Sequence, residues 1–153
     1  MVGRKIPGLY ETKHNGKEAE FYADMLSHLL KNKLGKSGKL ILNIASRGNT
    51  TKNQNLQLGL SKARERNHKN KPEKTKVEFN VQNHRKEPLL NISDYFCWAV
   101  QRVFERGECR YYNFLNDKVS LVVDLYDEDN YKGSKNYYKK KNRLTASNKI
   151  EYK

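Results

Sequence analysis

The chain has 153 residues, which fits one domain built around a single core. Its net charge is +14 and only 36% of its residues are hydrophobic, with no run near the ~20 apolar residues of a membrane span. Composition therefore excludes a membrane-spanning protein. The two cysteines and four scattered histidines show no zinc-site spacing, and no apolar signal core follows the first residues, so we expect a protein of the reducing cytoplasm.

An extended segment is expected over residues 1–16, where glycines and a proline occur without a steady period. Apolar pairs then recur every four residues over 17–33 and predict a helix with one apolar stripe. The mostly apolar run 39–45 is typical of a buried strand. A second helix follows, capped by Asn49 or Thr50.

Alternating apolar residues over 77–81 predict a strand with one buried face, and Pro88 opens the most apolar helix of the chain. A short segment, 111–115, comes next, followed by a last strand or helix over 118–125. The tail, residues 131–153, has no apolar period, so its order would depend on docking to the body or to a partner.

The alternation of helices and strands predicts an α/β fold with a parallel sheet. Two or three strands make a thin sheet, which offers too little surface to cover three helices and leaves an unpaired edge. We therefore expect this chain to be part of a larger sheet, completed by an N-terminal half, a second chain or oligomerisation.

The positive charge lies in two segments. Residues 46–76 carry nine Lys/Arg and two acidic residues, and residues 131–153 carry eight Lys/Arg and one acidic residue, whereas the remainder is neutral. Two local positive fields favour nucleic acid as a partner, and the alternative is a solvated face with a solubilising tail. The predicted contact residues are Arg47, Lys52, Arg64, Arg66, Lys139, Lys140, Lys141 and Arg143.

The helix after Pro88 carries the pattern Asn91-Ile92-Ser93-Asp94, followed by the run Tyr95-Phe96-Cys97-Trp98. Residues 87–108 resemble the C-terminal region of the bacterial domain of unknown function 3800 family, which has a ribonuclease H-like fold. Looser matches cover most of residues 17–146. They are Phe21-Tyr22, Arg47-Gly48 and the stretch from Tyr137-Tyr138 to Leu144-Thr145.

The resemblance implies a partial ribonuclease H-like α/β fold with helix-strand-helix-strand-helix order, over residues 17–130. The first three antiparallel strands of that fold would be missing. The family has an Asp-Glu pair on its first strand, which no early strand-like segment here contains. It also has a Gln-x-x-Asp motif on the late helix. The corresponding residues here are Asn91-Ile92-Ser93-Asp94, so asparagine replaces the glutamine of the motif. Residues 1–16 and the basic tail, 131–153, would lie outside the partial domain.

Ribonuclease H-like nucleases cleave phosphodiesters with Mg²⁺ ions held by converging carboxylates. The resemblance implies that Asp94 is a metal ligand and that Asn91 orients it or a metal-bound water. Another acid would come from the helix over 17–33, where the candidates are Glu18, Glu20 and Asp24.

Each of these residues also has a structural interpretation. Asn91 and Asp94 are nearly a capping box, in which Asn91 is the N-cap and Asp94 meets the helix amides. Arg47-Gly48 is either a turn or a phosphate contact at the end of a strand.

The aromatic residues are open to two interpretations as well. Trp98 and Cys97 are expected in the core. Rings in polar, basic surroundings are the better candidates for base stacking, and these are Tyr10, Tyr137 and Tyr138.

Two functions follow from the sequence. The first is a Mg²⁺-dependent nuclease-like domain that is incomplete and inactive alone, because an expected carboxylate strand is missing. The alternative is a non-catalytic module that binds nucleic acid or a protein partner.

Overall fold

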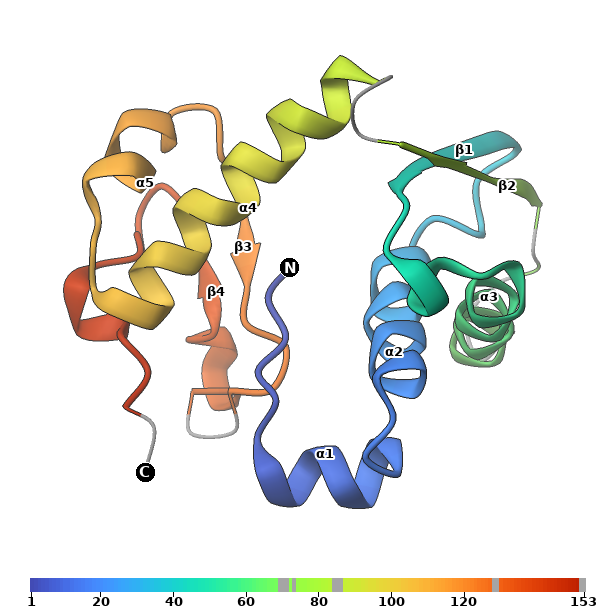
Figure 1. Cartoon of the computed structure of the whole chain (residues 1–153), viewed down its shortest axis with the longest axis horizontal. Coiled ribbons are helices and arrows are strands. Elements are labelled where there is room, and N and C mark those ends of the chain that lie inside the picture. The colour runs from blue at the N-terminus through green and yellow to red at the C-terminus, as the bar shows by residue number, and fades with distance from the viewer. Residues whose placement is uncertain (69–71, 73, 84–86, 128–129, 152–153) are drawn as a thin grey trace. The chain divides into compact units, whose positions relative to one another are not determined.

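The computed structural model describes residues 1–68, 72, 74–83, 87–127 and 130–151 (Figure 1). It combines helices with a small parallel sheet, so the predicted α/β class is confirmed. Among the described residues, no helix is both long and apolar enough to cross a membrane.

The chain divides into two compact units. We call Lys5–Glu87 the strand-pair unit, and Met1–Arg4 with Pro88–Lys153 the late-helix unit. Each unit has its own cluster of buried hydrophobic residues, whereas the sequence predicted one core and a domain over residues 17–130. The observed units differ from the predicted domain because residues of the tail, 131–153, pack with the late helix in a separate core.

The sheet of the strand-pair unit consists of β1 (Gly38–Ala45) and β2 (Thr75–Gln82), which pair in parallel as predicted. Apolar partners share one face of this pair: Leu40 lies opposite Val77, and Leu42 opposite Phe79. The other face is mainly polar. It carries an Asn80–Asn43 hydrogen bond of 2.8 Å and a Lys39–Glu78 ion pair of 2.7 Å.

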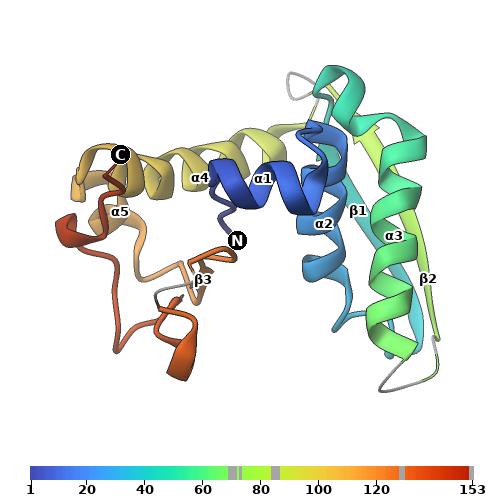
Figure 2. The same ribbon diagram turned by 90° about the horizontal axis from the view of Figure 1, so that it is seen from below.

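Two helices cover the apolar face of the strands. They are α2 (Glu18–Leu30) and α3 (Asn53–His68), and Figure 2 shows them side by side next to β1 and β2. The core of the unit consists of leucines from these helices and of Leu34, which follows α2: Leu26, Leu30, Leu34, Leu56 and Leu60. The predicted helices over 17–33 and after Asn49 are thereby confirmed, with a 3-10 turn, η1 (Gly48–Thr51), preceding α3.

The prediction of an extended segment over residues 1–16 is wrong for α1 (Pro7–His14). Pro7 begins this helix, where its fixed backbone angle suits the first turn, and Asn15 ends it in the left-handed conformation at φ 53°. Tyr10 and His14 pack their rings against Phe21 of α2 at centroid distances of 5.8 and 5.2 Å. Sequence periodicity did not indicate this helix because its stabilising contacts come from another element.

The late-helix unit is built on α4 (Pro88–Arg106) and α5 (Arg110–Leu115). Its sheet is the short antiparallel pair β3 (Val122–Val123) and β4 (Tyr137–Tyr138), with the 3-10 turns η3 (Lys132–Ser134) and η4 (Ala146–Asn148). The core consists of Val103, Phe104, Tyr112, Val122, Tyr138 and Leu144. Tyr138 and Leu144 belong to the tail, so the tail docks on α4.

The first four residues belong to the same unit. The Val2 amide donates to the Val123 carbonyl at 2.7 Å, and the Leu125 amide donates to the Val2 carbonyl at 2.9 Å. The Arg4 guanidinium then pairs with two buried carboxylates, Asp124 at 2.5 Å and Asp127 at 3.3 Å. Burial raises the pKa of the Asp124 carboxyl, and the Arg4 charge opposes that rise.

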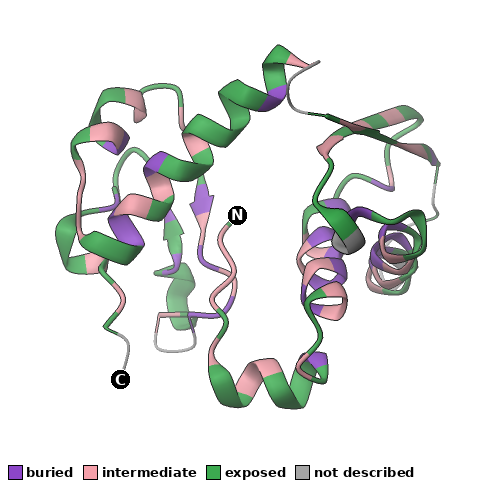
Figure 3. Ribbon diagram, in the orientation of Figure 1, coloured by how far each residue is buried: buried purple, intermediate pink, exposed green. Residues whose placement is uncertain are grey.

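The first half of α4 is largely exposed, as the green turns of that helix in Figure 3 show. Cys97 is exposed and Trp98 keeps 36% of its surface accessible, so the prediction that both lie in the core is wrong. The buried side chains of α4 are instead Leu90, Ala99, Val103 and Phe104.

Candidate functional site

Asp94 and Asn91 lie on the exposed part of α4, three residues apart and therefore on one side of the helix. The helix begins at Pro88, so Asn91 is inside it and is not the N-cap. The capping-box interpretation is therefore wrong. Asp94 is also exposed at the surface and does not lie at the rim of a core.

A metal site needs several ligands that converge on one point. Within the described ranges, no group of three or more His, Cys, Asp or Glu side chains is placed to hold a metal ion. The residues that the structure describes therefore supply Asp94 as a single carboxylate and do not complete a magnesium site around it.

The three acids of α2 that were candidates for a second ligand are all paired with cations. Glu18 accepts a hydrogen bond from Lys5 at 2.6 Å, and this contact lowers the pKa of the Glu18 carboxyl. Glu20 accepts a hydrogen bond from Lys62 of α3, also at 2.6 Å. The Lys62–Glu20 pair links α3 to α2, and each of the two pairs occupies an oxygen that a metal would need.

Asp24 is the third acid of α2 and is almost fully buried. Its carboxylate lies 2.5 Å from the Arg66 guanidinium of α3, 3.1 Å from Lys13 Nζ and 3.2 Å from His14 Nε2 of α1. Because a buried carboxylate is costly unless it is paired, these contacts explain why the acid is tolerated there. Asp24 thus joins α1, α2 and α3.

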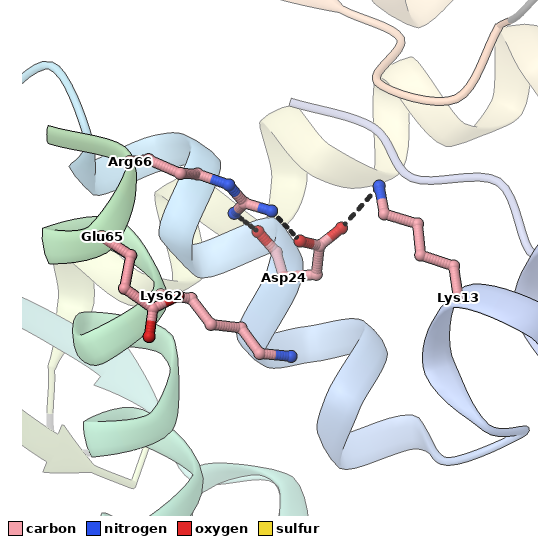
Figure 4. A pocket seen from close by; sticks show the side chains of 5 residues that line it. All are labelled: Lys13, Asp24, Lys62, Glu65 and Arg66. Atoms are coloured by element: carbon pink, nitrogen blue, oxygen red, sulfur yellow. Dashed lines mark hydrogen bonds and ion pairs between the residues drawn. The ribbon is translucent and has the colours of Figure 1, made fainter. Parts of the chain in front are cut away.

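A cavity of about 260 Å³ adjoins this carboxylate. Figure 4 shows Arg66 and Lys13 reaching Asp24 from opposite sides, with Lys62 and Glu65 on α3 completing the lining. The lining therefore consists of three cationic and two acidic side chains. Arg66, predicted as a nucleic-acid contact, is therefore committed to an internal ion pair.

The end of β1 carries the next predicted contact. Arg47 is exposed, and its backbone amide donates to Thr51 Oγ1 at 2.9 Å, which closes the turn into α3. Burial raises the pKa of the nearby Tyr22 phenol, and the Arg47 charge opposes that rise. Lys52 and Arg64 are exposed too, so this region keeps three of its four predicted contact residues at the surface.

The second basic segment forms an ordered turn, which we call the basic turn (residues 139–143). Lys139 and Asn142 exchange two backbone hydrogen bonds, of 2.8 and 2.9 Å, and Asn142 Nδ2 donates to the Tyr137 carbonyl at 3.3 Å. The four predicted contact residues of this turn are all exposed: Lys139, Lys140, Lys141 and Arg143. The fold therefore presents four cations within five consecutive residues.

The aromatic candidates differ in their surroundings. Tyr138 is buried against Phe104, at a centroid distance of 6.2 Å, so it is not available for stacking. Tyr137 keeps 38% of its surface exposed next to the basic turn. Tyr10 is half-buried and packs on Phe21.

Sequence reasoning missed other residues. Arg4 and Lys13 pair with acids more than ten residues away, so no local pattern indicates them. The rings of Tyr95, Trp98 and Tyr111 lie close together, with Trp98 exposed where the sequence predicted a core residue. No protein-family model, curated protein or solved structure matches the chain.

Proposed function

We propose that this chain is a nucleic-acid-binding module with a partial ribonuclease H-like fold. The basic turn is the observation that supports the proposal. Two backbone hydrogen bonds fix the turn, and Lys139, Lys140, Lys141 and Arg143 are all exposed on it. Exposed cations gathered on one turn attract phosphates, and the backbone that carries them is already ordered before binding.

The strand-pair unit supplies a second basic region. Arg47 and Lys52 flank the turn at the carboxyl end of β1, where ligands gather in parallel sheets. The helix-strand-helix-strand order of this unit and the following α4 agree with the later part of a ribonuclease H-like fold. Among the described residues, β1 and β2 form a sheet of two strands, so each strand has an edge at which a further strand could pair.

Nuclease chemistry is proposed only for a completed protein. Mg²⁺ would be bound by Asp94, assisted by Asn91, together with carboxylates from a segment or chain that adds the missing strands. Until those ligands are present, we expect binding without cleavage.

The first prediction concerns the basic turn. Replacing its four cations by glutamine should weaken binding of a labelled oligonucleotide and reduce the dependence of log affinity on log salt. The slope falls by about 0.7 per lost phosphate contact for a single strand and about 0.9 for a duplex. Fluorescence anisotropy over a salt series measures both quantities.

A control variant changes the charge equally, at lysines that already pair with carboxylates. Lys5, Lys39, Lys76 and Lys118 contact Glu18, Glu78, Glu78 and Asp117, respectively. Their replacement by glutamine should change the slope less than the basic-turn variant does. Equal effects of the two variants would mean that net charge alone drives binding, against the proposal.

Cleavage is tested in the same samples. Incubation with Mg²⁺ should leave DNA and RNA intact. Cleavage that disappears in Asp94→Asn would instead show that the chain is a complete nuclease.

A further inference from the structure

Three aromatic rings form a row on the surface of the late-helix unit. Tyr95 and Trp98 on α4 stack at a centroid distance of 5.7 Å with an interplanar angle of 29°. The Tyr111 ring on α5 lies 4.5 Å from the Trp98 ring, tilted by 54°. Tyr95 is 44% exposed and Trp98 is 36% exposed. We call these three residues the aromatic row.

Two guanidinium groups flank the row. Arg102 lies over the Trp98 ring at 5.4 Å, and Arg110 lies over the Tyr111 ring at 4.6 Å. Glu108 holds both arginines, at 2.9 Å from Arg102 Nε and 2.7 Å from Arg110 Nε. Because one carboxylate pairs with two cations, these three side chains together carry one net positive charge.

An exposed aromatic cluster with a cationic rim has a recognisable ligand chemistry. Leaving large rings in water forfeits the free energy of their burial, so such clusters mark binding surfaces. Nucleobases stack on flat aromatic faces, and guanidinium groups attract the adjoining phosphates. A purely apolar protein partner would bring no anionic group to pair with the guanidinium groups of Arg102 and Arg110.

We propose that the aromatic row is a stacking platform for unpaired bases of single-stranded nucleic acid. This inference rests on the proposed function and specifies its substrate. Bases in a duplex already stack on each other and do not offer their faces, so the row selects single strands. Asp94 lies four residues before Trp98, on the same side of α4, so a stacked base sits about one helical turn from that carboxylate.

The only tryptophan of the chain provides the readout, because its fluorescence reports directly on stacking. An oligothymidine of about 12 nucleotides should quench Trp98, since sites for single strands span roughly 4–16 nucleotides. An abasic oligomer of the same length, which keeps the phosphates and lacks the bases, should bind to the basic turn without quenching. A duplex of the same length should also leave the fluorescence unchanged.

Substitution provides a second test. Trp98→Ala should weaken oligothymidine binding by about tenfold, and Trp98→Phe should retain most of the affinity, because one stacked base contributes on the order of a tenfold to hundredfold effect. Neither variant should change the affinity for the abasic oligomer. Phe114→Ala is the matched control, since Phe114 is a 79% exposed aromatic residue of α5 outside the row. Circular dichroism verifies that each variant is folded.

The outcomes separate this inference from the proposed function. Salt-dependent binding with no quenching, or equal affinities of Trp98→Ala and wild type for oligothymidine, overturns the platform and leaves the basic turn in place. Absence of any binding overturns both. Trp98 emission that shifts with protein concentration, in the absence of nucleic acid, would show that a second copy covers the row and would also overturn the platform.

Discussion

At the scale of single residues, the surroundings of a charge decide its role. Arg66 and Lys140 count equally in the net charge, yet Arg66 lies 2.5 Å from a buried carboxylate whereas Lys140 is exposed on the basic turn. An ion pair that neutralises an internal acid offsets the cost of burying that acid and leaves little electrostatic field to attract a ligand. Charge counting along the sequence therefore overestimates the basic surface of α3.

The lowered pKa of His28 leads to a prediction about the pH dependence of stability. Burial, reinforced by the nearby Arg66 charge, lowers the pKa of the His28 imidazole from 6.5 to about 4. The folded state then binds fewer protons than the unfolded state between these pH values, so acidification through this range should destabilise the strand-pair unit, by up to about 3 kcal/mol. NMR titration of the His28 ring measures the pKa directly.

His28→Gln is the control for that experiment. It should remove the assigned resonance and flatten the pH dependence of unfolding between about 6.5 and about 4. A His28 midpoint near 6.5 would contradict the prediction, because it would mean that the imidazole is well solvated in the folded protein.

At the scale of elements, the close approach of α2 and α3 depends on a glycine in the middle of a helix. A Cβ placed on Gly59 would lie 2.9 Å from Leu26 Cδ2 and 3.2 Å from the Ala23 carbonyl oxygen. Glycine normally costs a helix about 1 kcal/mol relative to alanine. Here the absence of a side chain allows two helices to pack against one face of β1 and β2.

Gly59→Ala should therefore destabilise the protein, although alanine is the better helix former. We expect a loss of about 1–3 kcal/mol from overpacking, measured by urea unfolding. Gly8→Ala in α1 is the matched control, because no atom lies within 4 Å of a Cβ at that position. The control should be neutral or stabilising by up to about 1 kcal/mol, and stabilisation by both variants would contradict the packing argument.

At the scale of the whole molecule, two separate cores replace the single core expected from the chain length. Leu60 belongs to the core of the strand-pair unit, and Val103 to that of the late-helix unit. The first four residues join the late-helix unit through Val2 and Arg4. Each core is small, so each unit depends on its own few buried side chains.

A substitution in one core should therefore destabilise only the unit that contains that core. Leu60→Ala should cost about 2–5 kcal/mol locally and accelerate hydrogen exchange in β1, α2 and α3. Exchange in the second half of α4 should change little, as should the Trp98 fluorescence, which reports on the late-helix unit. Faster exchange throughout the chain would show that the two units unfold together.

Much of the secondary structure was predictable because its signal is local. The four-residue spacing in α2, the alternating residues of β2 and the proline that begins α4 each lie within a short window, and all three elements are confirmed. The helix α1 was not predicted from the sequence, because its apolar residues are few and it is stabilised by contacts with Phe21 of the next helix.

The α/β class, the parallel pairing of the two strands and the two basic segments could be predicted, since each follows from composition or from a pattern along the chain. Three features became visible only in the folded protein: Asp24 is paired with Arg66, the tail folds onto α4, and Trp98 lies at the surface. The physical reason is that an apolar ring or a charge is buried only if distant residues cover it. No pattern within a single helix records which of its faces will be covered.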